Sequence, residues 1–141
     1  MTRRPSTAIL LAVVVSLAVA AAEAGAFSKA YLFKPGVNLQ VEEEIALGLR
    51  LDSIRFDVPG EQGGPFQAAA TISNLGQESH MFSVGIALFD DAGNLLAAGN
   101  GGPRMFPLRA GRQGVFKVSF DGFDADAANA TQFKIVIAVS R

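Results

Sequence analysis

The side chains that could carry out acid–base, nucleophilic or zinc chemistry are few in this sequence. His80 is its only histidine, it follows Glu78 and Ser79, and cysteine is absent. A zinc site needs roughly three or four ligands, and the segment around His80 does not supply them. We therefore expect His80 to lie in a surface loop without a catalytic or metal-binding role.

A group of oxygen donors stands near the C-terminus. Asp121, Asp124 and Asp126 lie within one segment, and these aspartates are the calcium candidates of the chain. Calcium prefers roughly six to eight oxygen ligands, and the spacing departs from the EF-hand because Ala128 stands at a ligand position. A solvated loop whose aspartates cap a helical turn explains the pattern better, so we expect no metal site.

Two further patterns fall short of a catalytic signature. The run Glu42-Glu43-Glu44 offers carboxylates, but an acid–base pair must be held roughly 5–10 Å apart across a substrate. A charged bend that protects a strand from edge pairing is the simpler interpretation. Ser83 lies in Met81-Phe82-Ser83-Val84-Gly85, which lacks the first glycine of G-x-S-x-G. We expect no catalytic residue and no cofactor.

An apolar segment, residues 27–33, precedes the turn residues Lys34-Pro35-Gly36. It can be the first strand of its own domain, or a segment donated to a neighbouring molecule by strand addition. Both interpretations stay open. Phe27, Tyr31 and Phe33 are therefore the candidate residues for contact with a partner.

Residues 1–26 have the pattern of a secretory signal peptide. Arg3 and Arg4 precede an apolar run from Ala8 to Ala22, and A-x-A sequences end at Ala22, Ala24 and Ala26. The run is shorter than the roughly 20 residues that span a bilayer. We predict cleavage after Ala26, which leaves residues 27–141 as a single periplasmic or secreted domain without a membrane span. An uncleaved anchor is the alternative.

Composition narrows the list of partners. The formal net charge is −1 and no long basic run occurs, which argues against nucleic acid and anionic membrane. Because cysteine is absent, apolar burial must stabilise the exported domain without disulfides.

The region after residue 26 alternates between apolar and polar residues in short runs that turn residues separate. We count seven or eight short strands and no long helix. This pattern predicts an all-β, antiparallel two-sheet sandwich of immunoglobulin-like type with about seven strands, and a small barrel is the alternative. The residues predicted to face the core are Phe82, Val84, Ile86, Leu88, Phe116, Val118, Phe133, Ile135 and Ile137.

Several irregularities can be predicted as well. Apolar parity breaks at Glu43 and flips at Asp52-Ser53. We therefore expect a bend or bulge around residues 42–44, and a bulge or strand break at Asp52-Ser53. Asn74 and Gly76 close a strand with residues that tolerate positive φ. Prolines flank residues 104–106, which favours an edge strand.

Three segments together resemble the bacterial FxLYD family of immunoglobulin-like domains. They are Thr71-Ile72-Ser73-Asn74-Leu75-Gly76, the stretch from Ile86 to Leu95, and the stretch from Leu108 to Phe116. The resemblance covers roughly residues 54–139, and the chain departs from the family at Phe89, where tyrosine is usual, and at Ala110, where proline is usual. It implies a non-catalytic extracytoplasmic sandwich and carries no catalytic residues.

These features predict an exported, non-catalytic module that binds an envelope or extracellular protein or has a structural role in the cell envelope. A carbohydrate-binding or glycan-associated module is the alternative. Sugar sites use exposed aromatic platforms, whereas this chain has no Trp, one Tyr and eleven Phe that mostly fit inward positions. A small secreted enzyme is the third and least supported reading.

Overall fold

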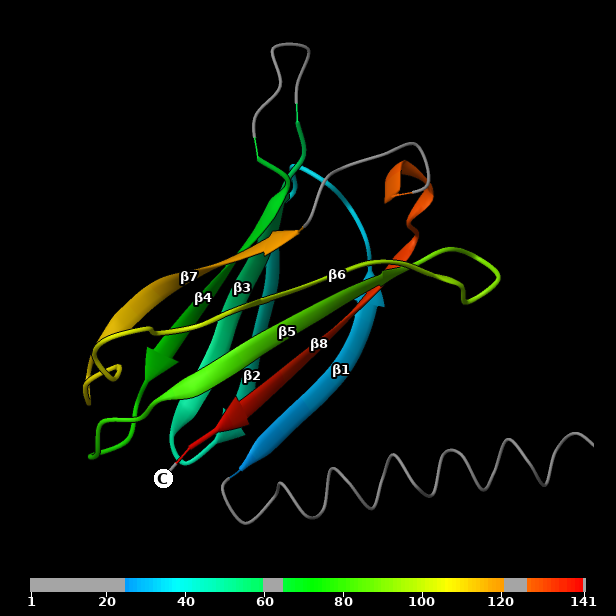
Figure 1. The fold of residues 1–141 in the computed structure, drawn as a ribbon. Coiled ribbons are helices and arrows are strands. Elements are labelled where there is room, and N and C mark those ends of the chain that lie inside the picture. The colour runs from blue at the N-terminus through cyan, green and yellow to red at the C-terminus, as the bar shows by residue number, and fades with distance from the viewer. Residues whose placement is uncertain (1–24, 60–64, 121–126, 141) are drawn as a thin grey trace, which may run out of the picture.

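Eight strands form one antiparallel sheet. The computed structural model describes residues 25–59, 65–120 and 127–140. The sheet order is β1-β8-β5-β6-β7-β4-β3-β2 (Figure 1). The elements are β1 (Ala26–Leu32), β2 (Leu39–Ala46), β3 (Leu49–Asp57), β4 (Gln67–Asn74), β5 (Phe82–Phe89), β6 (Leu95–Gly101), β7 (Gln113–Phe120), the short 3-10 helix η1 (Ala127–Asn129) and β8 (Gln132–Val139). The prediction of an all-β antiparallel class is confirmed.

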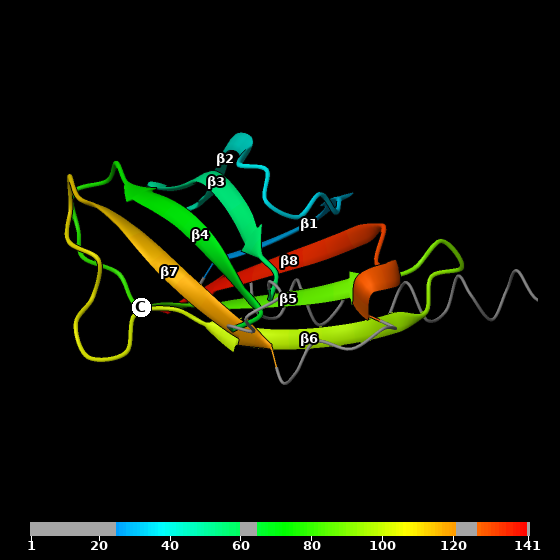
Figure 2. The same ribbon diagram turned by 90° about the horizontal axis from the view of Figure 1, so that it is seen from above.

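The sheet curls into an open barrel. Viewed from above, its strands follow one another round a ring that stays open between β1 and β2 (Figure 2). Two four-stranded halves face each other, and a short ladder between β6 and β7 joins them. The predicted separation into two sheets is therefore not seen, and the architecture is closer to the small-barrel alternative.

Two glycines of β6 explain why the halves are joined. A Cβ at Gly99 would lie 2.4 Å from the Ser119 carbonyl oxygen, and one at Gly101 would lie 2.2 Å from that of Lys117. Only glycine allows two backbones to approach so closely. Asn100-Gly101-Gly102 has the composition of a turn, but Asn100 and Gly101 belong to β6, so the strand continues through them.

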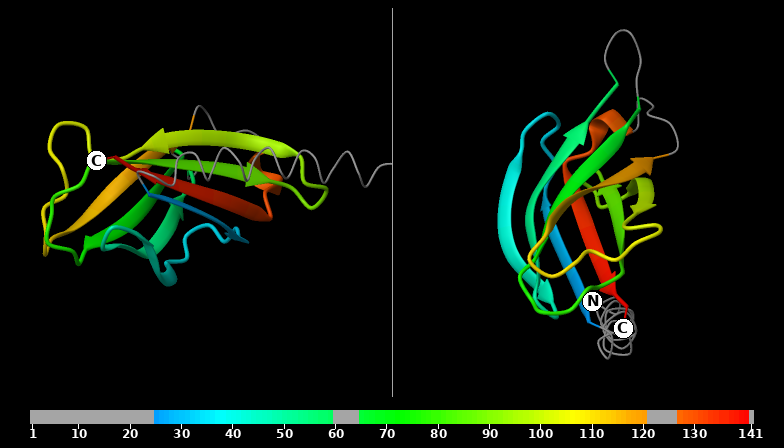
Figure 3. Two further views of the ribbon diagram at one scale, coloured as in Figure 1. Left: turned by 90° about the horizontal axis from the view of Figure 1, so that it is seen from below. Right: turned by 90° about the vertical axis from the view of Figure 1, so that its left-hand side faces the viewer.

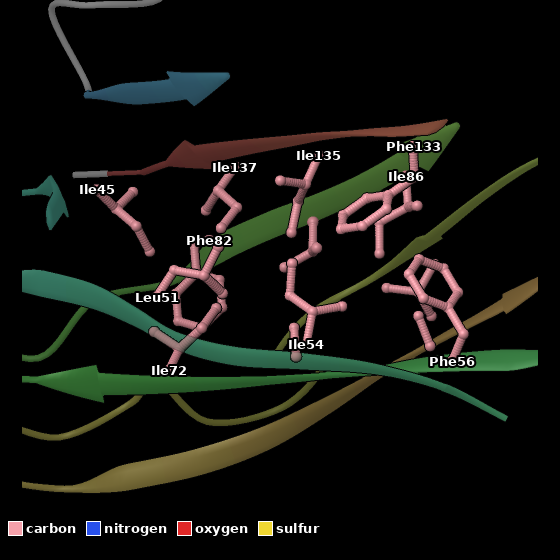
Figure 4. Close-up of a cluster of buried hydrophobic side chains, with 14 of the residues drawn as sticks. Ile45, Leu51, Ile54, Phe56, Ile72, Phe82, Ile86, Phe133, Ile135 and Ile137 are labelled. Carbon is pink, nitrogen blue, oxygen red and sulfur yellow. The ribbon is translucent and has the colours of Figure 1, made fainter. Parts of the chain in front are cut away.

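The core lies between the inner faces of the two halves, as the close-up in Figure 4 shows. The residues predicted to be buried are at most 4% exposed, apart from Phe116. Phe116 is half-buried, and its ring contacts Phe82 edge to face at a centroid distance of 4.8 Å. β3 and β4 supply the opposite wall with Leu49, Leu51, Ile54, Phe56 and Ile72.

Both predicted bulges are confirmed. The β2–β3 register shifts between Gln40 and Glu43, where Glu42 has a φ of 52°. The β3–β4 register shifts between Leu51 and Ser53. At Asp52 the extra residue lets both Leu51 and Ile54 face the core although the apolar parity changes between them. The β2–β3 register shifts a second time between Glu44 and Ala46.

One local prediction is confirmed in part and another was wrong. β4 ends at Asn74 as expected, but Asn74 and Gly76 are not among the residues with positive φ. Instead the buried Asn74 side chain accepts a hydrogen bond from the Gly76 N–H at 3.0 Å, and a Cβ at Gly76 would lie 3.1 Å from the Leu47 carbonyl oxygen. Residues 104–106 form bends within a loop and no strand, because pairing in that loop is confined to Leu108, opposite His80.

Candidate functional site

The gap between β1 and β2, here called the seam, is the feature that the sequence could not reveal. β1 pairs with β8 and β2 pairs with β3, and no ladder joins β1 to β2 in the described ranges. The seam is closed at one end, where a Cβ on Gly25 would lie only 2.7 Å from the Ala46 Cβ. At the other end a pocket lies between the end of β1 and the start of β2.

Side chains bridge the seam at mid-height. The Glu43 carboxylate accepts hydrogen bonds from the Lys29 ammonium group and, at 3.0 Å, from the Tyr31 hydroxyl. The Tyr31 ring also stacks on Phe133 at a centroid distance of 5.4 Å. Charges on edge strands discourage pairing with other chains, so the bridge disfavours strand addition between Gly25 and Lys29.

The bridge shifts the pKa values of two of its members. The Lys29 hydrogen bond, with a smaller contribution from Tyr31, holds the pKa of the Glu43 carboxyl below its ordinary value despite partial burial. Burial raises the pKa of the Tyr31 phenol, and the hydrogen bond and charge of Glu43 raise it further. The bridge is thus an ionised carboxylate held by a cation and a neutral phenol.

An apolar pocket of about 190 Å³ lies where the seam opens. It is lined by Tyr31, Leu32, Lys34, Val37, Leu39, Ile54, Phe56 and Phe133. Its floor belongs to the core, whereas Leu32 and Val37 at its rim are 64% and 52% exposed. A cavity of roughly 150 Å³ holds one benzene ring, and small-molecule sites run from about 300 Å³ upwards. The pocket therefore matches one large apolar side chain better than a small-molecule ligand.

Unpaired backbone groups run along β1 beside this pocket. The Gly25 carbonyl accepts from the Val139 N–H, and the Phe33 N–H donates to the Thr131 carbonyl, both at 2.9 Å, so odd-numbered residues of β1 face the β8 side. Because backbone groups alternate in direction along a strand, Ala30 and Leu32 direct their N–H and C=O groups towards the seam.

The three residues named as partner candidates have different environments. Phe33 is 9% exposed, and its ring contacts Phe56 at 4.8 Å. Phe27 and Tyr31 are half-buried and pack against the core. Within the chain, β1 is thus docked on β8, and of the three only Tyr31 lines the pocket.

The prediction that His80 lies in a surface loop was wrong, because its side chain is buried. It is 8% exposed, because it pairs with Leu108 in both directions: the His80 N–H donates to the Leu108 carbonyl at 3.1 Å, and the Leu108 N–H donates to that of His80 at 2.9 Å. His80 also lines a shallow concavity of about 570 Å³ together with Leu47, Gln77, Glu78 and Ser79. Its backbone role ties two loops together.

A buried carboxylate at Asp52 escaped the sequence reasoning. It accepts hydrogen bonds from Arg50 at 2.6 Å, from Gln113 at 2.9 Å and from the Ser73 hydroxyl. Burial raises the pKa of the Asp52 carboxyl, but the three hydrogen bonds and the Arg50 charge outweigh it and hold the pKa below its ordinary value. Only its position at a bulge hinted at this role, and the cluster joins β3, β4 and β7.

The remaining acidic residues form no centre that the structure can describe. The calcium candidates Asp121, Asp124 and Asp126 lie outside the described residues. Within the described ranges, no three His, Cys, Asp or Glu side chains come together as metal ligands, and no helix there has the length and hydropathy of a membrane span. Glu43 accepts the hydrogen bonds of the bridge, and Glu42 lies at the bulge in β2.

Comparisons with known proteins identify no family. No family model matches the chain, and no curated protein sequence matches it. Among solved structures the chain is similar to the Avr2 effector protein from the fungal plant pathogen Fusarium oxysporum, with a TM-score of 0.35 and 12% identity over 80% of this chain and 86% of that one. A similarity this low gives no functional argument.

Proposed function

We propose that this protein is an exported, non-catalytic β module that binds an extended apolar segment of a partner protein at the open end of the seam. The observation that carries the proposal is that the unpaired edge of β1 lies next to a pocket large enough for one side chain. Ala30 and Leu32 direct backbone groups towards the seam, and Leu32 also lines the pocket of about 190 Å³.

The chemistry corresponds to recognition by strand addition. In that mode the main-chain hydrogen bonds supply affinity, and pockets for alternate side chains supply specificity. The bound segment would place one large apolar side chain on the floor made by Ile54, Phe56 and Phe133. Lys34 lines the same pocket, so a carboxylate next to that apolar residue would be favoured.

The same proposal accommodates the remaining sequence-based predictions. Cleavage of residues 1–26 would leave the module in the periplasm or outside the cell. The FxLYD resemblance implies a non-catalytic extracytoplasmic sandwich, and the two halves that face each other across the core are compatible with it. The partner in this view is an envelope or extracellular protein, with no cofactor or metal in the interaction.

Selection from a random peptide library on the immobilised protein tests this function. We expect enriched peptides with an extended pattern around one large apolar residue. Leu32→Asp with Val37→Asp should weaken their binding at least tenfold, which corresponds to about 1.4 kcal/mol, because each places a charge on the apolar rim. Leu95→Asp is the matched control, since Leu95 is 62% exposed on β6 and does not line the pocket. A library without enriched peptides, or binding that the rim variants leave intact, would refute the function.

A further inference from the structure

The loop between β6 and β7, residues 102–112, carries the two most exposed large apolar side chains among the described residues. Met105 is 82% exposed and Phe106 is 74% exposed. They are neighbours, and Pro103 and Pro107 flank them with Arg104. Contact between water and two adjacent bulky apolar side chains is unfavourable. Adjacent exposed apolar residues of this kind mark sites that a second surface covers.

The base of this loop is held firmly by the domain. Leu108 is 8% exposed, and its carbonyl accepts from the Asn74 side chain at 2.9 Å as well as from His80. The Asn74 backbone N–H donates to the Arg112 carbonyl at 2.8 Å, and the Gly111 N–H donates to the Asn74 carbonyl at 2.8 Å. The exposed tip therefore projects from a fixed base, as the yellow loop in the left view of Figure 3 shows.

The loop that carries the apolar tip also carries three arginines. Arg104, Arg109 and Arg112 are all exposed. The ion pairs among described residues, Lys29–Glu43, Arg50–Asp52 and Arg55–Asp57, involve none of the three. An exposed apolar tip on a basic loop complements a surface that is apolar beneath and anionic at its face, which is the chemistry of an acidic lipid bilayer.

The course of the chain places the start of the domain at the same end of the barrel. Gly25 lies against Ala46 and Leu47, Gly48 bonds to Leu75, and Asn74 bonds to Leu108, so contacts lead from residue 25 to this loop. Only Glu23 and Ala24 separate Gly25 from the apolar run that ends at Ala22. Three peptide units reach on the order of 10 Å. The loop and the point where the described chain begins therefore lie at the same end of the barrel.

We propose that residues 104–107 dock on an anionic lipid surface. Met105 and Phe106 enter the region between headgroups and acyl chains, and Arg104, Arg109 and Arg112 contact the lipid phosphates. The absence of a long basic run argued against anionic membrane at the level of composition. The three arginines in the loop that carries the apolar tip instead favour an anionic membrane as the partner at this end of the molecule. The seam function is independent of this contact.

A single tryptophan tests the proposal directly. The chain has no Trp, so Phe106→Trp in the full-length protein places one fluorophore at the tip. Mixed with vesicles that contain phosphatidylglycerol, its emission should shift to shorter wavelength and be quenched by brominated acyl chains. Leu95→Trp is the matched control, because Leu95 is also exposed but follows the β5–β6 hairpin at the opposite end. Insertion of residues 1–22 alone would not depend on Arg104, Arg109 and Arg112, so the arginine replacements separate it from docking of the loop.

Two measurements decide the outcome. Replacing Arg104, Arg109 and Arg112 with Gln in the Phe106→Trp background should raise the lipid concentration at half-maximal shift about 100-fold, since each arginine contributes about fivefold near an anionic surface. Far-UV circular dichroism confirms that each variant is folded. No shift at residue 106 on anionic vesicles overturns the proposal. An equal shift on pure phosphatidylcholine that the arginine changes leave intact overturns it as well.

Discussion

At the scale of single residues, the carboxylates of Glu43 and Asp52 have different structural roles. Glu43 faces inward on an edge strand and is held by Lys29 and Tyr31, so it closes part of the seam. Asp52 sits at a bulge and ties three neighbouring strands together. The sequence marks both positions as breaks in apolar parity. It does not show that Tyr31 and Ser73 are their partners, because those contacts depend on how the sheet curls and pairs.

Tyr31 offers a direct measurement of the bridge. It is the only tyrosine and the chain has no Trp, so absorbance near the tyrosinate band reports this side chain alone. Burial and the neighbouring Glu43 carboxylate raise the pKa of Tyr31, so its ionisation should begin above the ordinary value of about 10. Glu43→Gln should lower the pKa again, although burial keeps it raised. A titration that Glu43→Gln leaves unchanged would show that the bridge is not formed in solution.

Asp52→Asn should destabilise the fold by about 1–3 kcal/mol at pH 7, because the new amide donor faces the donors that the carboxylate had accepted. The pKa of Asp52 is lowered in the folded state. Its contribution is therefore complete above the unfolded value of about 3.9 and is lost as the pH falls through the folded value. Urea denaturation at pH 7 and at pH 3 should show the difference from the native protein shrinking at acid pH. Asp57→Asn, which removes an exposed ion pair with Arg55, should cost about 1 kcal/mol or less.

At the scale of elements, most strands and both bulges could be predicted from the sequence, but the segments that connect strands could not. Alternation over Phe82, Val84, Ile86 and Leu88 locates β5 because a strand with one buried face repeats every second residue. The continuation of β6 through Gly101 was missed, since glycine in a strand leaves the same mark as glycine in a turn. Likewise, the prolines that flank residues 104–106 occur both in edge strands and in loops, so they could not show that this segment is a loop.

The first strand gives a prediction about where the domain begins. The Gly25 carbonyl accepts a hydrogen bond from Val139, and Ala26 pairs with Ala138. A protein that starts at Phe27 loses these contacts, whereas one that starts at Gly25 keeps them. We expect the shorter form to be less stable by about 1 kcal/mol, the typical net value of one hydrogen bond.

Chemical denaturation of the two forms measures this difference, and N-terminal sequencing of the exported protein shows which form cells produce. Cleavage after Ala24 retains Gly25 and Ala26 in the sheet, while the predicted cleavage after Ala26 removes them. Equal midpoints for both forms would mean that β1 gains nothing from its first two residues.

At the scale of the whole molecule, the sequence could not predict how the strands join into one curled sheet. Strand count and antiparallel class follow from period and turn chemistry, but whether the strands form two sheets or one curled sheet depends on a three-residue ladder between β6 and β7. The seam exists because that ladder joins the halves on one side and leaves them apart on the other. A candidate site made by two strands that do not pair has no sequence signature. The sequence therefore indicates Tyr31 only as part of the apolar segment 27–33, and not as a residue that lines a pocket.

Backbone hydrogen exchange with and without a selected peptide tests the central claim most directly. Strand addition at the open seam predicts slower exchange of the Ala30 and Leu32 amides upon binding, because these N–H groups face the seam. Ala26, at the closed end beside Ala46, should be unaffected, as should the loop of residues 102–112. Protection confined to β1 and β2 is the result that we expect. Protection elsewhere, with Ala30 and Leu32 exchanging as in the free protein, would contradict the seam as the binding site.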